Sequence, residues 1–276
     1  MTPLTGISSM ATRQVLADMT AAYEHETGAK VAIESVGGVD AAKRVRAGER
    51  FDVVILASNV VDQLVAEGHA LAGSRVDLVR SGVAIAVRSG APRPDIGSED
   101  AVRNAVRHAR SVSYSTGPSG DYLAKLFERW GVADEIASRI VKPAPGIPVG
   151  KLVAEGSVEL GFQQLSELMF LPGIDVAGPL PPAIQHVTTF SGAGCATSSR
   201  ADEARRLLAC CELPCGSNCL SVASLRRPHA GYAIPRYVVT FAGPATSPSA
   251  SRRWRNCATI GDCRWTSKAA SSTYVS

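Results

Sequence analysis

Small polar residues recur where an apolar run gives way to a helical pattern, and these residues have the clearest chemical potential. They fall in four stretches: Ser8 and Ser9, Gly37 and Gly38, Ala57 and Ser58, and Ser115 with Ser119 and Gly120. The start of a helix offers unpaired backbone N–H groups, and such groups bind anions together with hydroxyls. One such loop would indicate no more than a helix cap, but four loops predict an anion site without a buried countercharge.

Three more residues are candidates for that site. Val149 follows Pro148 and is expected to open a helix with its backbone N–H unpaired. Gln163 and Gln164 end an apolar run, and their amides both donate and accept hydrogen bonds, which suits a carboxylate or a partly protonated ligand. The alternative for the two glutamines is an ordinary place in a surface loop.

These patterns assign no catalytic residue. Glu34, Asp40 and Glu167 lie near the predicted site loops, but solvated carboxylates are the commoner explanation for such residues. The segment around Ser119 lacks the Gly-x-Ser-x-Gly elbow of serine hydrolases. The five histidines are scattered without a pair at metal-ligand spacing, so neither a metal nor a cofactor is expected.

The elements that must position the site residues alternate over residues 4 to about 209. Short apolar runs are followed by helical patterns, which is typical of βαβ units with a parallel sheet and predicts an α/β fold. A second series of such units is expected to begin with a strand at residues 83–87. The first predicted helix shows the pattern in its apolar residues Val15, Leu16, Met19 and Tyr23.

The alternation stops after Ala209. Beyond it the chain becomes rich in Ser, Arg, Pro and Cys without helical or strand spacing. The run from Cys210 to Pro214 is expected to break the preceding helix. We therefore interpret residues 210–276 as a frameshifted or disordered tail that contributes little packing, with a disulfide-linked tail as the alternative. Zinc is disfavoured because Cys211, Cys215 and Cys219 do not form two tight pairs.

Charge and hydropathy exclude several partners. The formal net charge is +4, from 29 basic and 25 acidic residues, and no long run of like charges occurs. Nucleic acid is therefore not an expected partner. No apolar run is long enough to insert into a membrane, and the first residues lack the basic flank and apolar core of a signal peptide. As written, the chain is expected to stay in the cytoplasm.

Several segments together carry a family resemblance. Residues 6–9, 51–58, 148–156 and 160–168 resemble class II periplasmic-binding proteins of the molybdate-binding type, over residues 4 to about 209. A branch of that family that looks like bacterial aconitate isomerase is more similar still. That closer resemblance is carried by residues 74–78, 91–96, 113–115 and 161–168.

The resemblance implies a two-lobed fold of mixed sheets flanked by helices, with two strands crossing between the lobes. Residues 1–80, completed by 190–209, would form one lobe, and residues 81–185 the other. The implied function is capture of a small anion, either an oxyanion such as molybdate or a small carboxylate, by a monomer that serves an ABC transporter permease in the periplasm. The alternative is an isomerase that interconverts cis- and trans-aconitate.

Overall fold

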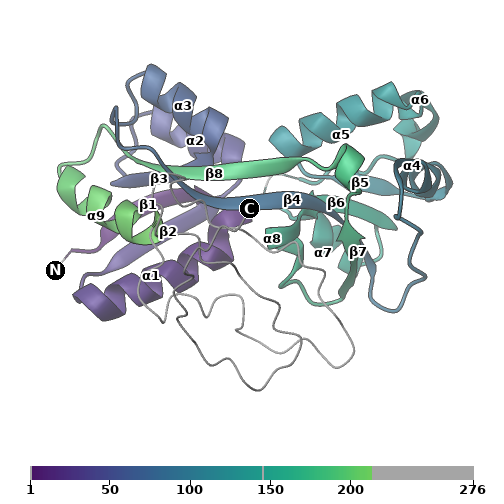
Figure 1. Ribbon diagram of the computed structural model, residues 1–276, viewed down its shortest axis with the longest axis horizontal. Coiled ribbons are helices and arrows are strands. Elements are labelled where there is room, and N and C mark those ends of the chain that lie inside the picture. Colours follow the sequence, from purple (N-terminus) through teal and green to yellow (C-terminus); the bar gives the residue numbers. More distant parts are fainter. Residues whose placement is uncertain (1, 145, 213–276) are drawn as a thin grey trace, which may run out of the picture. The chain divides into compact units, whose positions relative to one another are not determined.

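A mixed β-sheet runs through the computed structural model, which describes residues 2–144 and 146–212 (Figure 1). Its strands are β1 (Leu4–Ser9), β2 (Val31–Val36), β3 (Val53–Ala57), β4 (Val76–Arg88), β5 (Val112–Tyr114), β6 (Leu160–Gln164), β7 (Ile174–Pro179) and β8 (Val187–Gly194). The strand order is β2-β1-β3-β8-β4-β6-β5, and β7 also pairs with β4. The predicted α/β class is confirmed, and the sheet is mixed as the resemblance implied.

Helices follow most strands, as the alternating pattern predicts. The α-helices are α1 (Arg13–Thr27), α2 (Gly38–Arg46), α3 (Ser58–Ala66), α4 (Glu99–His108), α5 (Pro118–Arg129), α6 (Ala133–Ile136), α7 (Val149–Ala154), α8 (Leu165–Leu168) and α9 (Ala201–Glu212). Short 3-10 helices are η1 (Met10–Thr12), η2 (Ala137–Arg139) and η3 (Pro182–Ile184). No helix within the described ranges is long and apolar enough to cross a bilayer.

The strands β4 and β8 make the sheet mixed, which the prediction of a parallel sheet missed. β1 pairs with β2 and β3 in parallel, and β5 pairs with β6 in parallel. The long strand β4 runs antiparallel to β8 over its first part and antiparallel to β6 and β7 over its second part. It therefore belongs to two halves of the sheet, which we call the β1–β3 half and the β5–β7 half.

The point where β4 passes from one half to the other is held by a side chain. The Gln185 amide oxygen accepts the Val83 N–H at 2.9 Å, and the Gln185 amide nitrogen donates to the Val83 carbonyl at 3.1 Å. Gly82 leaves room for this amide, because a Cβ there would lie 3.1 Å from the Gln185 side chain. The strand predicted at 83–87 is thus the second part of a longer strand.

Helices cover both faces of the β1–β3 half. The predicted apolar face of α1 is buried, and it packs with α9 against β1, β3 and β4. Gly28 ends α1 in the left-handed region, at φ 69°, and its N–H donates to the Glu24 carbonyl at 2.9 Å. On the opposite face, α2 and α3 bury Ala41, Val45 and Leu64 against β1 and β3.

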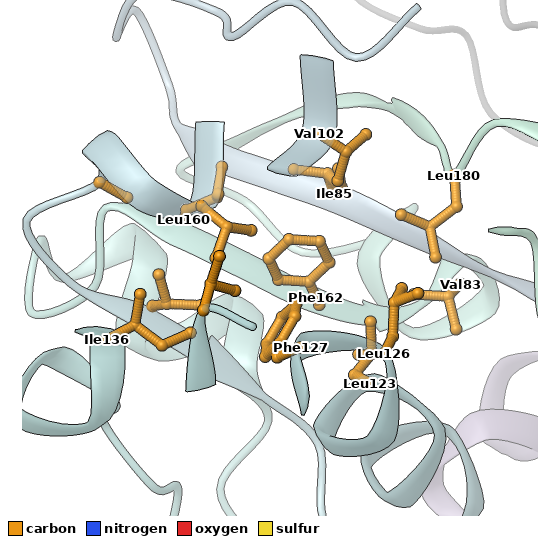
Figure 2. Packing of buried hydrophobic residues seen from close by; sticks show 14 of the residues in the cluster. Val83, Ile85, Val102, Leu123, Leu126, Phe127, Ile136, Leu160, Phe162 and Leu180 are labelled. Carbon is orange, nitrogen blue, oxygen red and sulfur yellow. The ribbon is translucent and has the colours of Figure 1, made fainter. Parts of the chain in front are cut away.

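The core of the β5–β7 half is centred on two aromatic rings (Figure 2). Phe127 on α5 and Phe162 on β6 contact edge to face, with ring centroids 5.9 Å apart and planes at 72°. The α4 helix packs on the same cluster through Val102 and Val106. Its start is capped by a side chain, because the Ser98 hydroxyl accepts the Ala101 N–H at 3.1 Å.

The last described helix continues past the predicted break. α9 extends through Glu212, and the side chain of Cys211 is buried beside Leu207 and Leu208 in the core that also holds α1. Native packing therefore continues past the expected end at Ala209, because the apolar spacing of α9 continues through Cys211. The remaining predictions for the tail fall on residues 213–276, which lie outside the described residues.

Candidate functional site

A cleft of about 290 Å³ lies between segments of the two halves of the sheet. The β1–β3 half contributes η1 and the starts of α2 and α3, and the β5–β7 half contributes residues 115–119, 143–144, 146–149, 163–164 and Glu167. Thr188 and Phe190 of β8 complete the lining. The cleft therefore lies at the carboxyl ends of β1, β2, β3, β5 and β6, where α/β proteins commonly bind ligands.

Nine of the twelve predicted site residues line this cleft. They are Ser9, Gly37, Gly38, Ala57, Ser115, Ser119, Val149, Gln163 and Gln164. All of them except Val149 lie where a strand leads into a helix, and Val149 opens α7 after a loop. The three predicted residues that do not line the cleft are Ser8, Ser58 and Gly120.

Those three residues lie behind or beside the cleft lining. Ser8 is fully buried, and its hydroxyl pairs with the Ser35 hydroxyl at 2.8 Å, because successive residues of a strand point to opposite faces. Ser58 is the first residue of α3 and is half-buried beside the cleft lining. Gly120 lies under the Ser115 carbonyl in the first turn of α5, where any Cβ would clash with that backbone group.

The helices that open on the cleft lack side-chain caps. The residues preceding α2, α3, α5 and α7 are Gly37, Ala57, Gly117 and Pro148, and none of them caps its helix through a side chain. Ala57, which precedes α3, has no side-chain acceptor that could cap the helix. Outside the cleft, α4 does have its serine cap. First-turn N–H groups of α2, α3 and α5 are consequently open to an external acceptor, whereas in α7 the Gly150 N–H already donates to the Gln163 side chain.

Hydroxyl groups add donors to the same cleft. Ser9 accepts the Ala11 N–H at 3.3 Å, which leaves the Ser9 O–H to donate elsewhere. Ser115 and Ser119 share one hydrogen bond of 2.9 Å between their hydroxyls, so one of the two protons stays available. The cleft thus presents hydroxyl donors from both halves of the sheet.

The two predicted glutamines differ in how far they are engaged. The Gln163 amide oxygen accepts the Gly150 N–H at 3.1 Å, which fixes its amide nitrogen as the donor toward Glu167. Gln163 therefore orients other groups of the cleft. The Gln164 amide nitrogen lies 2.8 Å from the Thr188 hydroxyl, and its buried amide oxygen has no hydrogen-bond partner in the described part of the chain. Because the amide nitrogen donates to Thr188, the amide oxygen of Gln164 remains as an unused acceptor.

The sequence patterns did not identify the basic residues of the cleft, and they left the role of its carboxylate undecided. Lys43 and Arg46 line the cleft from α2. Their spacing in the sequence is that of an ordinary exposed helix face and gives no sign of a binding site. Arg46 is engaged by Glu67, with an Nε to Oε2 distance of 2.7 Å, whereas Lys43 is exposed and has no ion pair among the described residues. Lys43 is therefore the cation available to an entering anion.

Of the three carboxylates considered from the sequence, Glu167 alone lines the cleft. Glu34 is engaged in a bidentate pair with Arg44 at 2.7 and 2.9 Å, and Asp40 lies on α2 away from the lining. Burial raises the pKa of Glu167 to about 7, and the hydrogen bond from Gln163 offsets part of that rise. A carboxyl group with this pKa exchanges protons near neutral pH.

The raised pKa of Glu167 predicts a pH dependence of stability. The folded protein holds this proton up to about pH 7, whereas the ordinary value is 4.5, so the folded state binds more protons between these values. The Glu167 contribution to the free energy of unfolding should therefore fall as pH rises through this window. Urea denaturation of wild type and Glu167→Gln at several pH values checks this. The variant should lack that fall, while Glu128→Gln, at an exposed position of α5, should keep it.

Comparison with known proteins agrees with this architecture. Residues 4–212 match the family of bacterial extracellular solute-binding proteins. An aconitate isomerase from a Pseudomonas species is 41% identical over 213 residues, covering 75% of this chain and 81% of the relative.

Solved structures share the fold. The periplasmic molybdate-binding protein of Azotobacter vinelandii superimposes with a TM-score of 0.66 at 18% identity, covering 82% of this chain and 100% of that protein. A tungstate ABC transporter protein from Geobacter sulfurreducens gives 0.61 at 18% identity, covering 80% and 97%. The type 2 periplasmic-binding-protein fold implied by the sequence is confirmed, and the chain belongs to the family of bacterial extracellular solute-binding proteins.

Proposed function

We propose that this protein captures a small carboxylate anion in the cleft. In this proposal one lobe comprises residues 1–80 with 190–209, the other comprises residues 81–185, and the ligand lies between them. The observation that carries the proposal is the set of helix starts at the cleft, those of α2, α3 and α5, whose first-turn N–H groups have no side-chain cap. Such groups stabilise a negative charge without a buried countercharge.

The size and charge of the cleft favour a carboxylate over a tetrahedral oxyanion. A volume of about 290 Å³ corresponds to roughly ten water molecules of liquid, which a tetrahedral oxyanion would underfill. Lys43 adds a positive charge at the side of the cleft, suited to a second carboxylate of the same ligand. Citrate and aconitate carry several carboxylates on a short carbon chain and match both features.

The family supports an extracytoplasmic role. Its members are described as extracellular solute-binding proteins, and several structural neighbours belong to ABC transporters. We therefore propose that the protein works in the periplasm as a monomer and delivers its ligand to a transporter permease.

A ligand panel tests the proposed capture. Thermal unfolding of the full chain would be followed with molybdate, sulfate, citrate and trans-aconitate, because a ligand that binds the native state stabilises it. A carboxylate at about a hundred times its Kd should stabilise the protein by roughly 2.7 kcal/mol. Stabilisation by molybdate or sulfate alone would contradict the carboxylate proposal, and stabilisation by none of the four would contradict anion capture.

A serine in the cleft should matter for the anion and not for the fold. Replacing Ser9 with alanine removes a hydroxyl donor and should weaken carboxylate binding by roughly 1.5 to 3 kcal/mol, the range for a hydrogen bond to a charged group. Titration calorimetry measures the affinity. Ser98→Ala removes a helix-capping serine outside the cleft and should lower stability by about 1 kcal/mol with anion affinity unchanged. Equal affinities in wild type and Ser9→Ala would exclude Ser9 from the site.

A second function, aconitate isomerisation, is supported by the relative of that name and by the carboxyl group in the cleft. The reaction moves a proton from the methylene carbon of aconitate to the far carbon of the double bond, so one group that accepts and returns a proton suffices. NMR of trans-aconitate incubated with the full chain in D2O tests it. Formation of cis-aconitate that carries deuterium at its own methylene carbon, which was the vinylic carbon of trans-aconitate, would establish the activity. Binding without exchange would leave capture as the function.

A further inference from the structure

Glu167 occupies an unusual position for an anion-binding cleft. Among the described residues that line the cleft it is the only Asp or Glu, and it lies within reach of the same space as the uncapped helix starts. An ionised carboxylate beside a bound anion is repelled at short range, and the repulsion grows as water is excluded. The cleft therefore has to remove that charge when a carboxylate ligand enters.

Among the described residues, the elements that pack against the helix of Glu167 place no cation in contact with its carboxyl group. Its helix α8 packs against η1, β4, β6 and β7. The elements η1 and β6 carry no ionisable side chain. The ionisable residues of the other two elements are Asp77, Arg80 and Arg88 on β4 and Asp175 on β7.

Those four residues are engaged or directed elsewhere. Asp77 is paired with Arg75 at 2.8 Å, Asp175 lies 3.5 Å from Arg93, and the Arg88 guanidinium lies beside Gly156. Arg80 is exposed on β4. The charged residues that share the cleft with Glu167 are Lys43 and Arg46 on α2. Burial of the carboxyl group raises the pKa of Glu167 to about 7, and no neighbouring charge contributes to the rise.

Gln163 presents the Glu167 carboxyl group in a defined way. Because the Gly150 N–H can only donate, it fixes the Gln163 amide oxygen as acceptor, and the amide nitrogen then donates to Glu167. This hydrogen bond serves the ionised and the protonated carboxyl group alike. When protonated, Glu167 gains an O–H that can donate to a ligand carboxylate, and such charge-assisted hydrogen bonds are short and strong.

We propose that Glu167 takes up one proton when a carboxylate enters the cleft, so that the protein captures its ligand together with a proton. The proton comes from solvent and is held on the Glu167 carboxyl group, which changes from a repelling anion into a hydrogen-bond donor. The inference rests on the proposed capture of a small carboxylate. It adds that affinity is coupled to pH through one residue, with a stronger complex at lower pH.

Titration calorimetry of the full chain with trans-aconitate tests this coupling. The carboxyl groups of this probe are ionised above about pH 6, so a pH effect above that value belongs to the protein. Titrations in HEPES and Tris at the same pH give the number of protons exchanged, because these buffers differ in ionisation enthalpy and neither is a small oxyanion. We expect an uptake close to one proton per anion at about pH 8, and a Kd that rises about tenfold per pH unit above about pH 7.

Substitutions test whether Glu167 is the residue that takes up the proton on anion binding. Glu167→Gln keeps the shape and should bind with no proton uptake and with an affinity independent of pH, while the exposed Glu128→Gln should behave as wild type. Anion binding by wild type without proton uptake would overturn the inference while the proposed capture stands. Persistent uptake in Glu167→Gln would overturn it as well. No heat with any carboxylate would instead refute the capture itself. The wild-type measurement in two buffers stands even if the variant fails to fold.

Discussion

Replacing Gly120 with alanine is expected to abolish anion binding and to destabilise the protein by at least about 3 kcal/mol, at or above the upper end for overpacking. A Cβ at this position would overlap the Ser115 carbonyl oxygen and lie 2.9 Å from its carbonyl carbon. Both neighbours are backbone atoms, so no side-chain rotation relieves the clash. The first turn of α5 must move away from residue 115, and Ser115 and Ser119 then no longer share their hydrogen bond.

Chemical denaturation and calorimetry would measure both effects of Gly120→Ala. Gly97→Ala serves as the matched control, because Gly97 lies in an exposed loop where a Cβ would meet only the Asp95 carboxylate, at 3.3 Å. That control should stay within about 0.5 kcal/mol of wild type. A folded Gly120→Ala protein with normal anion affinity would mean that the loop after β5 is not part of the site.

Replacing Phe127 with alanine should cost about 3 to 5 kcal/mol of unfolding free energy, the usual range for a buried phenylalanine. Phe127 is 2% exposed, and Figure 2 shows its ring beside that of Phe162. Its ring centroid lies 5.8 Å from those of Tyr114 and Trp130 and 5.9 Å from that of Phe162. The deletion leaves a cavity between α5 and β6, the two elements that carry Ser119 and Gln163 toward the cleft.

Urea denaturation of Phe127→Ala and Phe127→Leu would check this prediction. The leucine variant keeps most of the apolar volume, so it should be clearly less destabilising than the alanine variant. A loss below about 1 kcal/mol for Phe127→Ala would show that this aromatic cluster is not the core of the β5–β7 half.

Local chemistry made much of the fold predictable. The buried face of α1, its end at Gly28 and the Ser98 cap of α4 all follow from spacing and from single residue types, and the structure has each of them. The crossing of β4 was not predictable in the same way. Arg80 is exposed, and Ser81 and Gly82 interrupt its apolar run, so only the second part of the strand stood out.

The candidate site was predictable where backbone position alone decides it. Ser9, Gly38 and Ser119 line the cleft because each stands where a strand leads into a helix. Tertiary contacts decided the rest. Gln163 is engaged by a glycine N–H thirteen residues away, and Glu167 differs from other glutamates only by being enclosed in the cleft. Neither feature leaves a trace in residue spacing.

Amide NMR of the full chain titrated with trans-aconitate tests the central claim most directly, because it reports on the backbone N–H groups that are proposed to hold the anion. We predict downfield shifts of the amide protons of Gly38, Ser119 and Val149 that saturate with a single Kd. The amides at the serine-capped start of α4, outside the cleft, should not move. Saturable binding with shifts confined to residues outside the cleft, or no binding at all, would contradict the account.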